Sequence, residues 1–146
     1  MVHEVSRQKI NIAIVGLGFG KEFIPIYQRH PDTHMYAICQ RSEEKLNAIG
    51  AQFGIEQRYT SFEDLIRDPQ VDAVHINSPI HLHAPQAVAA LKAGKHVACT
   101  VPAATTVDEC RDIVQALIQA RKNYMMMETA IYTREFLHIR EMRDTG

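Results

Sequence analysis

The 146-residue sequence predicts an α/β fold in which a doubly wound parallel sheet of the Rossmann type lies between two layers of helices. Three observations support this prediction. Short β-branched segments alternate with amphipathic segments, no hairpin dipeptide joins them, and a glycine-rich turn directly follows the first apolar segment. Strands and helices in this alternation build right-handed βαβ units, so we expect a three-layer α/β/α domain.

Three strands are expected in the first half of the chain. Residues 9–15 are a β-branched run typical of a buried strand, and residues 34–39 and the short segment 57–59 follow it. The periodicity predicts a helix over 22–30, and Ser42 stands where it can cap a helix leading to the third strand. Each of the first two strands is therefore followed by a crossover helix.

Two segments with the pattern of a capping box predict helix starts at Thr60 and at Thr106. The second of these helices carries an apolar face made of Val107, Cys110, Ile113, Val114, Leu117 and Ile118. The remaining expected elements are strands over 71–76, 95–99 and 124–127 and a helix over 82–93. We expect the methionines of the last strand to be buried.

Composition and charge argue against several classes of function. The formal net charge is −1 and 23% of the residues are charged, so no basic surface is available for nucleic acid. No apolar run approaches the about 20 residues needed to cross a bilayer, and the first residues lack a signal-peptide core. The histidines and cysteines follow no recognised metal-ligand spacing. We expect a soluble cytoplasmic protein without metal, nucleic-acid or membrane partners.

The glycine-rich turn is the strongest functional signal in the sequence. It lies between a strand and a helix, which is the context of a dinucleotide-binding fingerprint. Gly16 permits the tight turn and Gly18 lets the backbone approach a pyrophosphate, so we expect Gly16, Gly18, Phe19 and Gly20 around that group. The spacing departs from G-x-G-x-x-G because Lys21 occupies the third glycine position. Lys21 either lies in solvent or neutralises a phosphate.

The end of the second strand carries the second signal. An acidic residue that accepts hydrogen bonds from the adenosine ribose is expected there, and Gln40 stands in its place with Arg41 after it. No carboxylate repels a 2′-phosphate at these positions and a guanidinium is available to pair with one, which favours NADP over NAD. Gln40 is also able to bond a ribose diol, and Arg41 in an exposed loop is the alternative, so NAD stays open.

Residues 72–102, read with the glycine-rich turn and the Ala93-Gly-Lys-His-Val97 segment, resemble the Gfo/Idh/MocA family of NAD(P)-dependent oxidoreductases. The resemblance implies that the loop after the fourth strand lies at the carboxyl edge of the sheet, where such folds bind their ligand. The expected cofactor-side residues of this loop are Asn77, Ser78, Pro79 and His83. Packing at a helix terminus is the alternative role for His83.

At the catalytic position this sequence differs from the usual sequence of the family that it resembles. Family members usually carry Glu-Lys-Pro after the fifth strand, and the lysine assists proton transfer during hydride transfer. Here the segment is Thr100-Val101-Pro102, and a valine neither donates a hydrogen bond nor carries charge. The catalytic residues stay unassigned, and the sequence indicates a divergent subfamily.

Family members also carry a second α/β domain that binds substrate. We expect residues 1–130 to be the NAD(P)-binding Rossmann domain and residues 131–146 to be a surface helix leading toward a C-terminal substrate domain absent from this sequence. The implied function is the nucleotide-binding part of an oxidoreductase for a sugar, polyol or related hydroxy compound, inactive alone. A non-catalytic cofactor-binding sensor or regulator and an NAD-dependent glycosidase are the alternatives, and a homo-oligomer stays open.

Overall fold

The structure is a computed structural model, and it describes residues 9–146. Within this range six parallel strands form one sheet in the order β3-β2-β1-β4-β5-β6. The strands are β1 (Ile10–Val15), β2 (Thr33–Cys39), β3 (Gln57–Tyr59), β4 (Ala73–Ile76), β5 (His96–Thr100) and β6 (Tyr124–Met127). The direction in which strands are added reverses between β1 and β4, so the doubly wound Rossmann fold is confirmed.

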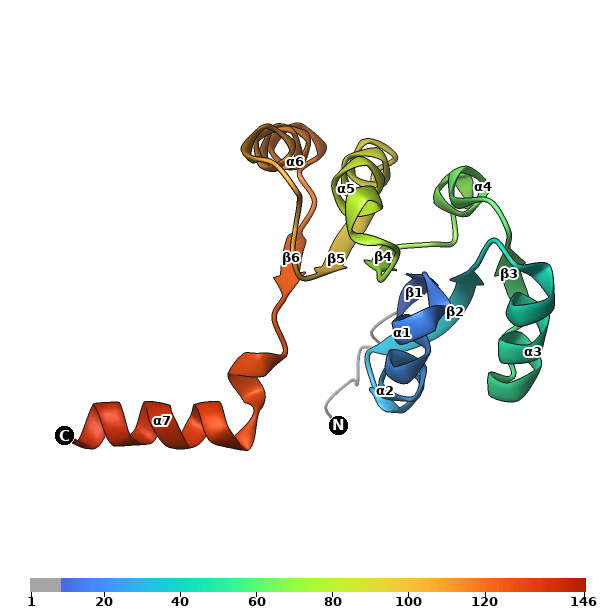
Figure 1. Cartoon of the computed structure of the whole chain (residues 1–146). Coiled ribbons are helices and arrows are strands. Elements are labelled where there is room, and N and C mark those ends of the chain that lie inside the picture. The colour runs from blue at the N-terminus through green and yellow to red at the C-terminus, as the bar shows by residue number, and fades with distance from the viewer. Residues whose placement is uncertain (1–8) are drawn as a thin grey trace, which may run out of the picture.

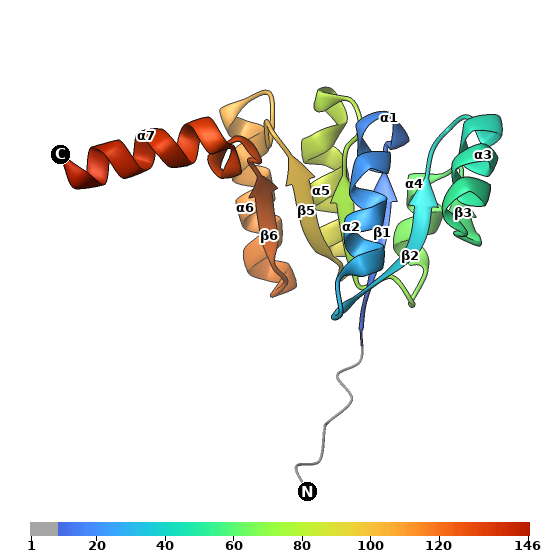
Figure 2. The same cartoon turned by 90° about the horizontal axis from the view of Figure 1, so that it is seen from below.

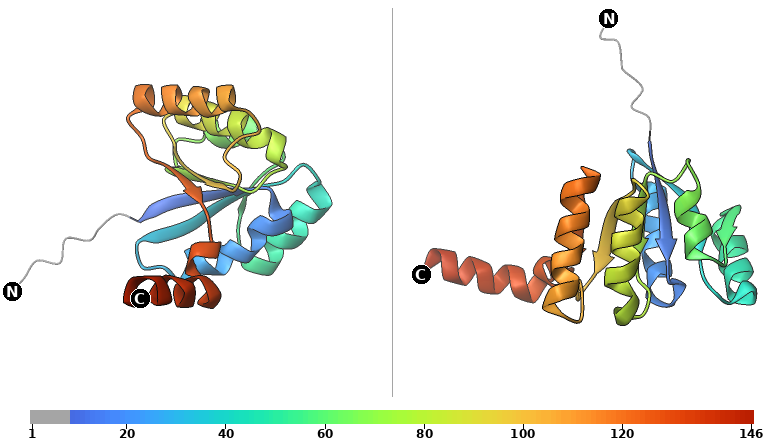
Figure 3. Two further views of the ribbon diagram at one scale, coloured as in Figure 1. Left: turned by 60° about the vertical axis from the view of Figure 1, so that its left-hand side comes forward. Right: turned by 90° about the horizontal axis from the view of Figure 1, so that it is seen from above.

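Helices cover both faces of the sheet (Figures 1 and 2). One layer holds α1 (Leu17–Gly20), a 3₁₀ turn (Lys21–Phe23), α2 (Ile24–Arg29) and α3 (Glu43–Phe53). The other holds α4 (Phe62–Arg67), α5 (His83–Lys92) and α6 (Val107–Ala120), with a 3₁₀ turn (Ile80–Leu82) before α5. A last 3₁₀ turn (Ala130–Tyr132) leads to α7 (Arg134–Thr145), which projects away from the sheet (Figure 3). No helix of residues 9–146 has both the length and the apolar content to cross a membrane.

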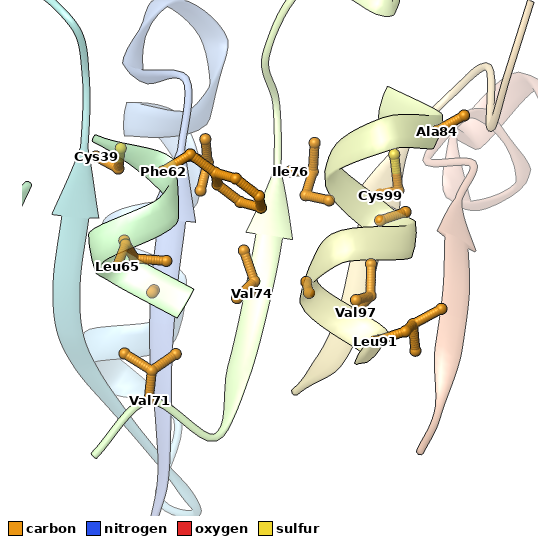
Figure 4. Packing of buried hydrophobic residues seen from close by; sticks show 14 of the residues in the cluster. Cys39, Phe62, Leu65, Val71, Val74, Ile76, Ala84, Leu91, Val97 and Cys99 are labelled. Carbon is orange, nitrogen blue, oxygen red and sulfur yellow. The ribbon is translucent and has the colours of Figure 1, made fainter. Parts of the chain in front are cut away.

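Side chains of each strand point alternately to the two faces of the sheet, so two separate hydrophobic cores form. Ala13 and Val15 enter the cluster under α4, α5 and α6, whereas Ile14 between them packs against the layer of α1, α2 and α3. Figure 4 shows the first of these clusters, in which Val74 and Ile76 of β4 lie between Phe62 of α4 and α5. The sheet is therefore covered by a buried cluster on each face, and the loops at its edges start from buried strand ends.

The helix after β1 begins earlier than the periodicity predicts. It starts at Leu17 and not near residue 22, because the glycine-rich turn itself forms the first helical turn. The predicted capping box at Thr60 is wrong, since Ser61 is the cap and its Oγ accepts a hydrogen bond from Asp64 N at 3.2 Å. The capping box at Thr106 is confirmed, with both reciprocal bonds formed.

The prediction that the methionines of β6 are buried is wrong. Met125 and Met126 are 54% and 48% exposed, and they point to opposite faces of β6 because side chains alternate along a strand. β6 is an edge strand, and neither of these two side chains is covered by a helix layer. The apolar face predicted for α6 is only partly buried: Ile113 packs in the core, while Val114 and Ile118 face outward. Residues 1–8 lie outside the described residues. They belong to the predicted domain 1–130 and are the segment in which the sequence shows no signal-peptide core.

Candidate functional site

A cavity of about 610 Å³ opens at the carboxyl ends of β1, β2 and β4, where the strand order reverses. Ligands of open α/β sheets bind at this switch point. Most of the residues predicted to bind a cofactor line it, namely Gly16, Gly18, Gln40, Arg41, Asn77, Ser78 and Pro79. Segments up to 63 positions apart in the sequence therefore meet at one edge of the sheet.

The glycines of the turn have different structural roles. Gly16 has a φ of +84°, and a Cβ there would lie 2.5 Å from the carbonyl oxygen of Asn77, so no other residue fits. A Cβ on Gly18 would meet nothing within 4 Å, and this open backbone faces the cavity. Gly20 packs on Ile14, where a Cβ would lie 2.7 Å from the Ile14 side chain. Gly20 thus takes the helix–strand packing role usually given to the third glycine.

The turn presents backbone donors toward the cavity. Because α1 begins at Leu17, the N–H groups of Gly18 and Phe19 lie in the first helical turn, which has no intrahelical acceptors for them. Lys21 is exposed and does not line the cavity, in agreement with the solvent alternative. The anion site offered here consists of backbone groups and the helix dipole.

Gln40 and Arg41 lie at the end of β2, as predicted. The Oε1 atom of Gln40 accepts a hydrogen bond from Leu17 N at 3.3 Å, which ties the end of β2 to the first turn of α1. This bond leaves the amide nitrogen of Gln40 as a donor. Arg41 is exposed at the cavity and forms no ion pair within residues 9–146. Its charge is available to a ligand.

The start of α4 also contributes to the cavity, which its sequence pattern does not predict. Ser61 and Glu63 line the same cavity, and Oγ of Ser61 donates to Glu63 Oε2 at 3.3 Å. The pattern of this segment predicts only a helix start. The available signal was its position, because it follows a parallel strand and must reach the carboxyl edge with the other loops.

The loop after β4 is held by side-chain contacts. Oγ of Ser78 donates to Gln86 Oε1, and the buried Oδ1 atom of Asn77 has no partner among the described residues. His83 is the first residue of α5 and is only 2% exposed. Its Nδ1 lies 2.7 Å from the Pro102 carbonyl oxygen and its Nε2 lies 2.8 Å from that of Ser78. His83 therefore bridges two loops.

A second cavity of about 330 Å³ adjoins the first, with Asn77 and Ser78 lining both. Phe19 and Val101 lie in its wall, and Val101 is 37% exposed. The full lining is Phe19, Asn77, Ser78, Ile80, His83, Thr100, Val101, Met127 and Thr129. His83 is the titratable group among these residues, so the position of the family lysine is apolar.

Other buried titratable groups lie away from these cavities. Burial lowers the pKa of His75 to about 4, and its Nδ1 lies 3.1 Å from the Tyr27 hydroxyl. Lys95 lies at the amino end of β5, as expected, and its Nζ donates to the carbonyl oxygens of Asp68 and Val71 at 2.7 Å each. Within residues 9–146 no three His, Cys, Asp or Glu side chains gather in a group able to hold a metal ion.

The residues of the first cavity fit a dinucleotide. Gly16 and Gly18 leave backbone space that a Cβ would fill or narrow, donors face the anion position, and the unpartnered Oδ1 of Asn77 offers an acceptor. Fold and site together define an NAD(P)-binding Rossmann domain.

Residues 10–128 match the family model described as the oxidoreductase family with an NAD-binding Rossmann fold. The chain belongs to this family, Gfo/Idh/MocA. The resemblance of residues 72–102 is thereby confirmed.

The chain is similar to 1,5-anhydro-D-fructose reductase of Ensifer adhaerens, with 39% identity over 74% of this chain and 32% of that protein. It is 42% identical to a glycosyl hydrolase family 109 protein of Shewanella pealeana, over 94% of this chain and 32% of that protein. The crystal structure of scyllo-inositol dehydrogenase from Lactobacillus casei with NAD(H) and scyllo-inositol superposes with a TM-score of 0.86 at 25% identity, covering 95% of this chain and 42% of that one. The chain thus spans about a third of the curated relatives named here.

Proposed function

We propose that the chain is the cofactor-binding part of an NAD(P)-dependent oxidoreductase that acts on a sugar, polyol or related hydroxy compound. The observation that carries this proposal is the cavity at the switch point, lined by the glycine-rich turn, Gln40, Arg41 and the loop after β4. The names of two relatives, an anhydrofructose reductase and an inositol dehydrogenase, support the substrate class. Residues 1–130 form the cofactor domain in this proposal, and 131–146 lead toward a substrate domain.

Each part of the site has an assigned task. The N–H groups of Gly18 and Phe19 bind the pyrophosphate, and Gln40 with Arg41 binds the adenosine ribose. The second cavity receives the nicotinamide ring, where Phe19 and Val101 exclude water. The bound cofactor supplies or accepts the hydride. The chain itself binds and orients that group.

We propose NADP as the preferred cofactor because Arg41 is free to pair with a 2′-phosphate. Glu63 in the same cavity opposes this preference, since a carboxylate repels a phosphate. Fluorescence titration of the chain with NADH and NADPH measures the balance. Tighter binding of NADPH than of NADH supports the proposal, and equal or weaker binding of NADPH overturns it.

Because a valine carries no proton, we propose that the group that assists proton transfer does not come from position 101. Within the second cavity His83 is the titratable side chain, and both its ring nitrogens contact carbonyl oxygens. The chain alone is therefore expected to bind cofactor without reducing a carbonyl compound. Turnover of polyols by the isolated 146-residue chain would contradict this assignment.

Two further functions keep specific support. The apolar residue Val101 favours a sensor or regulator that binds cofactor without chemistry. The similarity to glycosyl hydrolase family 109 proteins favours a glycosidase that uses a retained cofactor. Cofactor that stays bound through purification favours the glycosidase, because a retained cofactor must be regenerated within each cycle. Rapidly exchanging cofactor together with polyol oxidation, in a protein that includes the substrate domain, favours the dehydrogenase.

A further inference from the structure

Asn77 lies where the two cavities of the candidate site meet, and it lines both of them. Its backbone is held in place, because Asn77 N donates to the carbonyl oxygen of Val15 at 2.7 Å. Its side chain lies on the α1 side of the sheet, since a Cβ built on Gly20 would lie 3.2 Å from the Cβ and 3.3 Å from the Cγ of Asn77. The amide of Asn77 is therefore packed beside the glycine-rich turn.

This amide is poorly satisfied by the chain itself. Its Nδ2 atom donates to the carbonyl oxygen of His75 over 3.5 Å, which is the long limit of a hydrogen bond. Its buried Oδ1 atom has no hydrogen-bond partner among residues 9–146. A buried oxygen without a partner has lost its contact with water and gains no hydrogen bond in return, so it destabilises the fold. An unsatisfied polar group in the wall of a cavity indicates a role in ligand binding.

Neighbouring side-chain donors are engaged elsewhere. The Ser78 hydroxyl donates to the side chain of Gln86, and the Thr100 hydroxyl donates to a backbone carbonyl oxygen at 2.9 Å. The ring of His75, two residues earlier on the same face of β4, packs between aromatic side chains and forms no hydrogen bond with the amide. Within the described part of the chain, no donor therefore reaches Oδ1 of Asn77.

The chemistry of Oδ1 limits what its partner is. An amide oxygen accepts hydrogen bonds and donates none, so the partner must carry a donor, which an ionised pyrophosphate lacks. In the proposed arrangement the pyrophosphate lies in the first cavity and the nicotinamide ring in the second. The part of the cofactor that joins these two groups is a ribose, whose hydroxyl groups donate. The terminal torsion of an asparagine is broad, so the amide turns toward such a hydroxyl without a change in the backbone.

We propose that Asn77 is a specificity-determining residue: its Oδ1 accepts a hydrogen bond from a hydroxyl group of the nicotinamide ribose, so the site favours a dinucleotide over a mononucleotide. The inference rests on the proposed cofactor function of the same two cavities. ADP ends at its pyrophosphate and leaves Oδ1 without a partner, whereas a dinucleotide supplies one. A site that binds a hydroxyl group disfavours a ligand without it, because the buried polar atom of the protein then stays unpaired.

The test compares ligands that are extended by one group at a time, namely ADP, ADP-ribose and NAD⁺. Each is titrated by calorimetry into wild type, Asn77→Ala and Asn123→Ala, of which the last changes an exposed asparagine directly before β6, at the amino edge of the sheet. We expect Asn77→Ala to weaken the binding of ADP-ribose and NAD⁺ by about threefold to tenfold, the effect of one neutral hydrogen bond, and to leave the binding of ADP unchanged. Asn123→Ala should change none of the three affinities.

Thermal melting without ligand separates this role from a structural one. Removing an unsatisfied buried amide should leave the melting temperature unchanged or raise it, whereas loss of an amide that holds the fold together should lower it. Asn77→Leu, which keeps a similar side-chain volume without polar atoms, gives the same comparison if the alanine variant does not fold.

Equal losses of affinity for ADP-ribose and NAD⁺, without a loss for ADP, support the proposal. A loss for NAD⁺ alone overturns the assignment to the ribose, because the contact then requires the nicotinamide ring. Equal losses for all three ligands, a lowered melting temperature in both variants, or no loss at all overturn the inference and leave the proposed cofactor function intact. Failure of the wild type to bind any of the three ligands overturns the proposed cofactor function and this inference with it.

Discussion

Replacement of Gly16 by alanine is the perturbation whose effect the structure defines most closely. The φ of +84° places residue 16 in the left-handed region, which costs a residue with a Cβ about 1–2 kcal/mol. The new Cβ would lie 2.5 Å from Asn77 O and 2.6 Å from Ser78 N, both backbone atoms and both far inside the 3.4 Å at which ordinary contact begins. Relieving such an overlap in a packed region costs about 1–3 kcal/mol more.

We therefore expect Gly16→Ala to lower the free energy of unfolding by about 2–5 kcal/mol. In a domain of this size the melting temperature should fall by about 5–15 °C. Because the clash is with the loop after β4, NAD(P)H binding should be lost even in the fraction that folds. Urea denaturation and thermal melting measure the first effect, and nicotinamide fluorescence measures the second.

Gly18→Ala is the matched control. A Cβ there meets nothing within 4 Å and the residue does not have a positive φ, so stability should be unchanged or higher by up to about 1 kcal/mol. The methyl group would nevertheless occupy the backbone face that a pyrophosphate approaches, and affinity should fall by about tenfold or more. A Gly16→Ala protein that melts at the wild-type temperature would contradict the predicted clash with the loop after β4, and a Gly18→Ala protein that binds cofactor normally would contradict the predicted pyrophosphate position.

Three further predictions concern charge, pH and capping. Arg41→Ala should weaken NADPH binding by about tenfold and NADH binding much less, because only NADPH loses the pairing with the 2′-phosphate; Arg29→Ala, also at an exposed arginine, should change neither. Equal losses for both cofactors would contradict that pairing. The pKa of His75 is depressed to about 4 in the folded state, so the unfolded state binds more protons as pH falls, and stability should drop by about 2–3 kcal/mol between about pH 6.5 and about pH 4. His75→Leu should flatten that slope in urea denaturation, and an unchanged slope would assign it elsewhere. Thr106→Ala removes the cap that accepts from Glu109 N and should cost about 1 kcal/mol by thermal melting, with no effect on cofactor binding.

The sequence predicts the order of the elements and the location of the site because both depend on local patterns. The β-branched segments, the helix caps and the glycine-rich turn are each readable within a few residues. Parallel topology then brings every loop that follows a strand to one edge, so Gly16, Gln40 and Asn77 were expected together and lie together.

The failures have equally physical reasons. An apolar strand has the same sequence pattern at the edge of a sheet as at its centre. The exposure of Met125 and Met126 depends on which helices cover β6, and the sequence pattern does not show that. Thr60 and Ser61 are adjacent hydroxyl residues that both satisfy a cap pattern, and in the structure the helix begins at Phe62, which makes Ser61 the cap. The contact between the His83 ring and the carbonyl oxygen of Pro102 joins residues 19 positions apart, and no local sequence signal predicts it.

Mapping NAD⁺ binding by amide chemical shifts tests the cofactor site itself, because it reports where the cofactor binds as well as whether it binds. We predict saturable perturbations at Gly18, Phe19, Arg41 and Ser78, at the carboxyl edge of the sheet. Lys95 and Lys122 line a separate cavity at the opposite, amino edge of the sheet, and their amide signals should not shift. Perturbations confined to that amino edge, or none in a chain shown to be folded, would contradict the assignment.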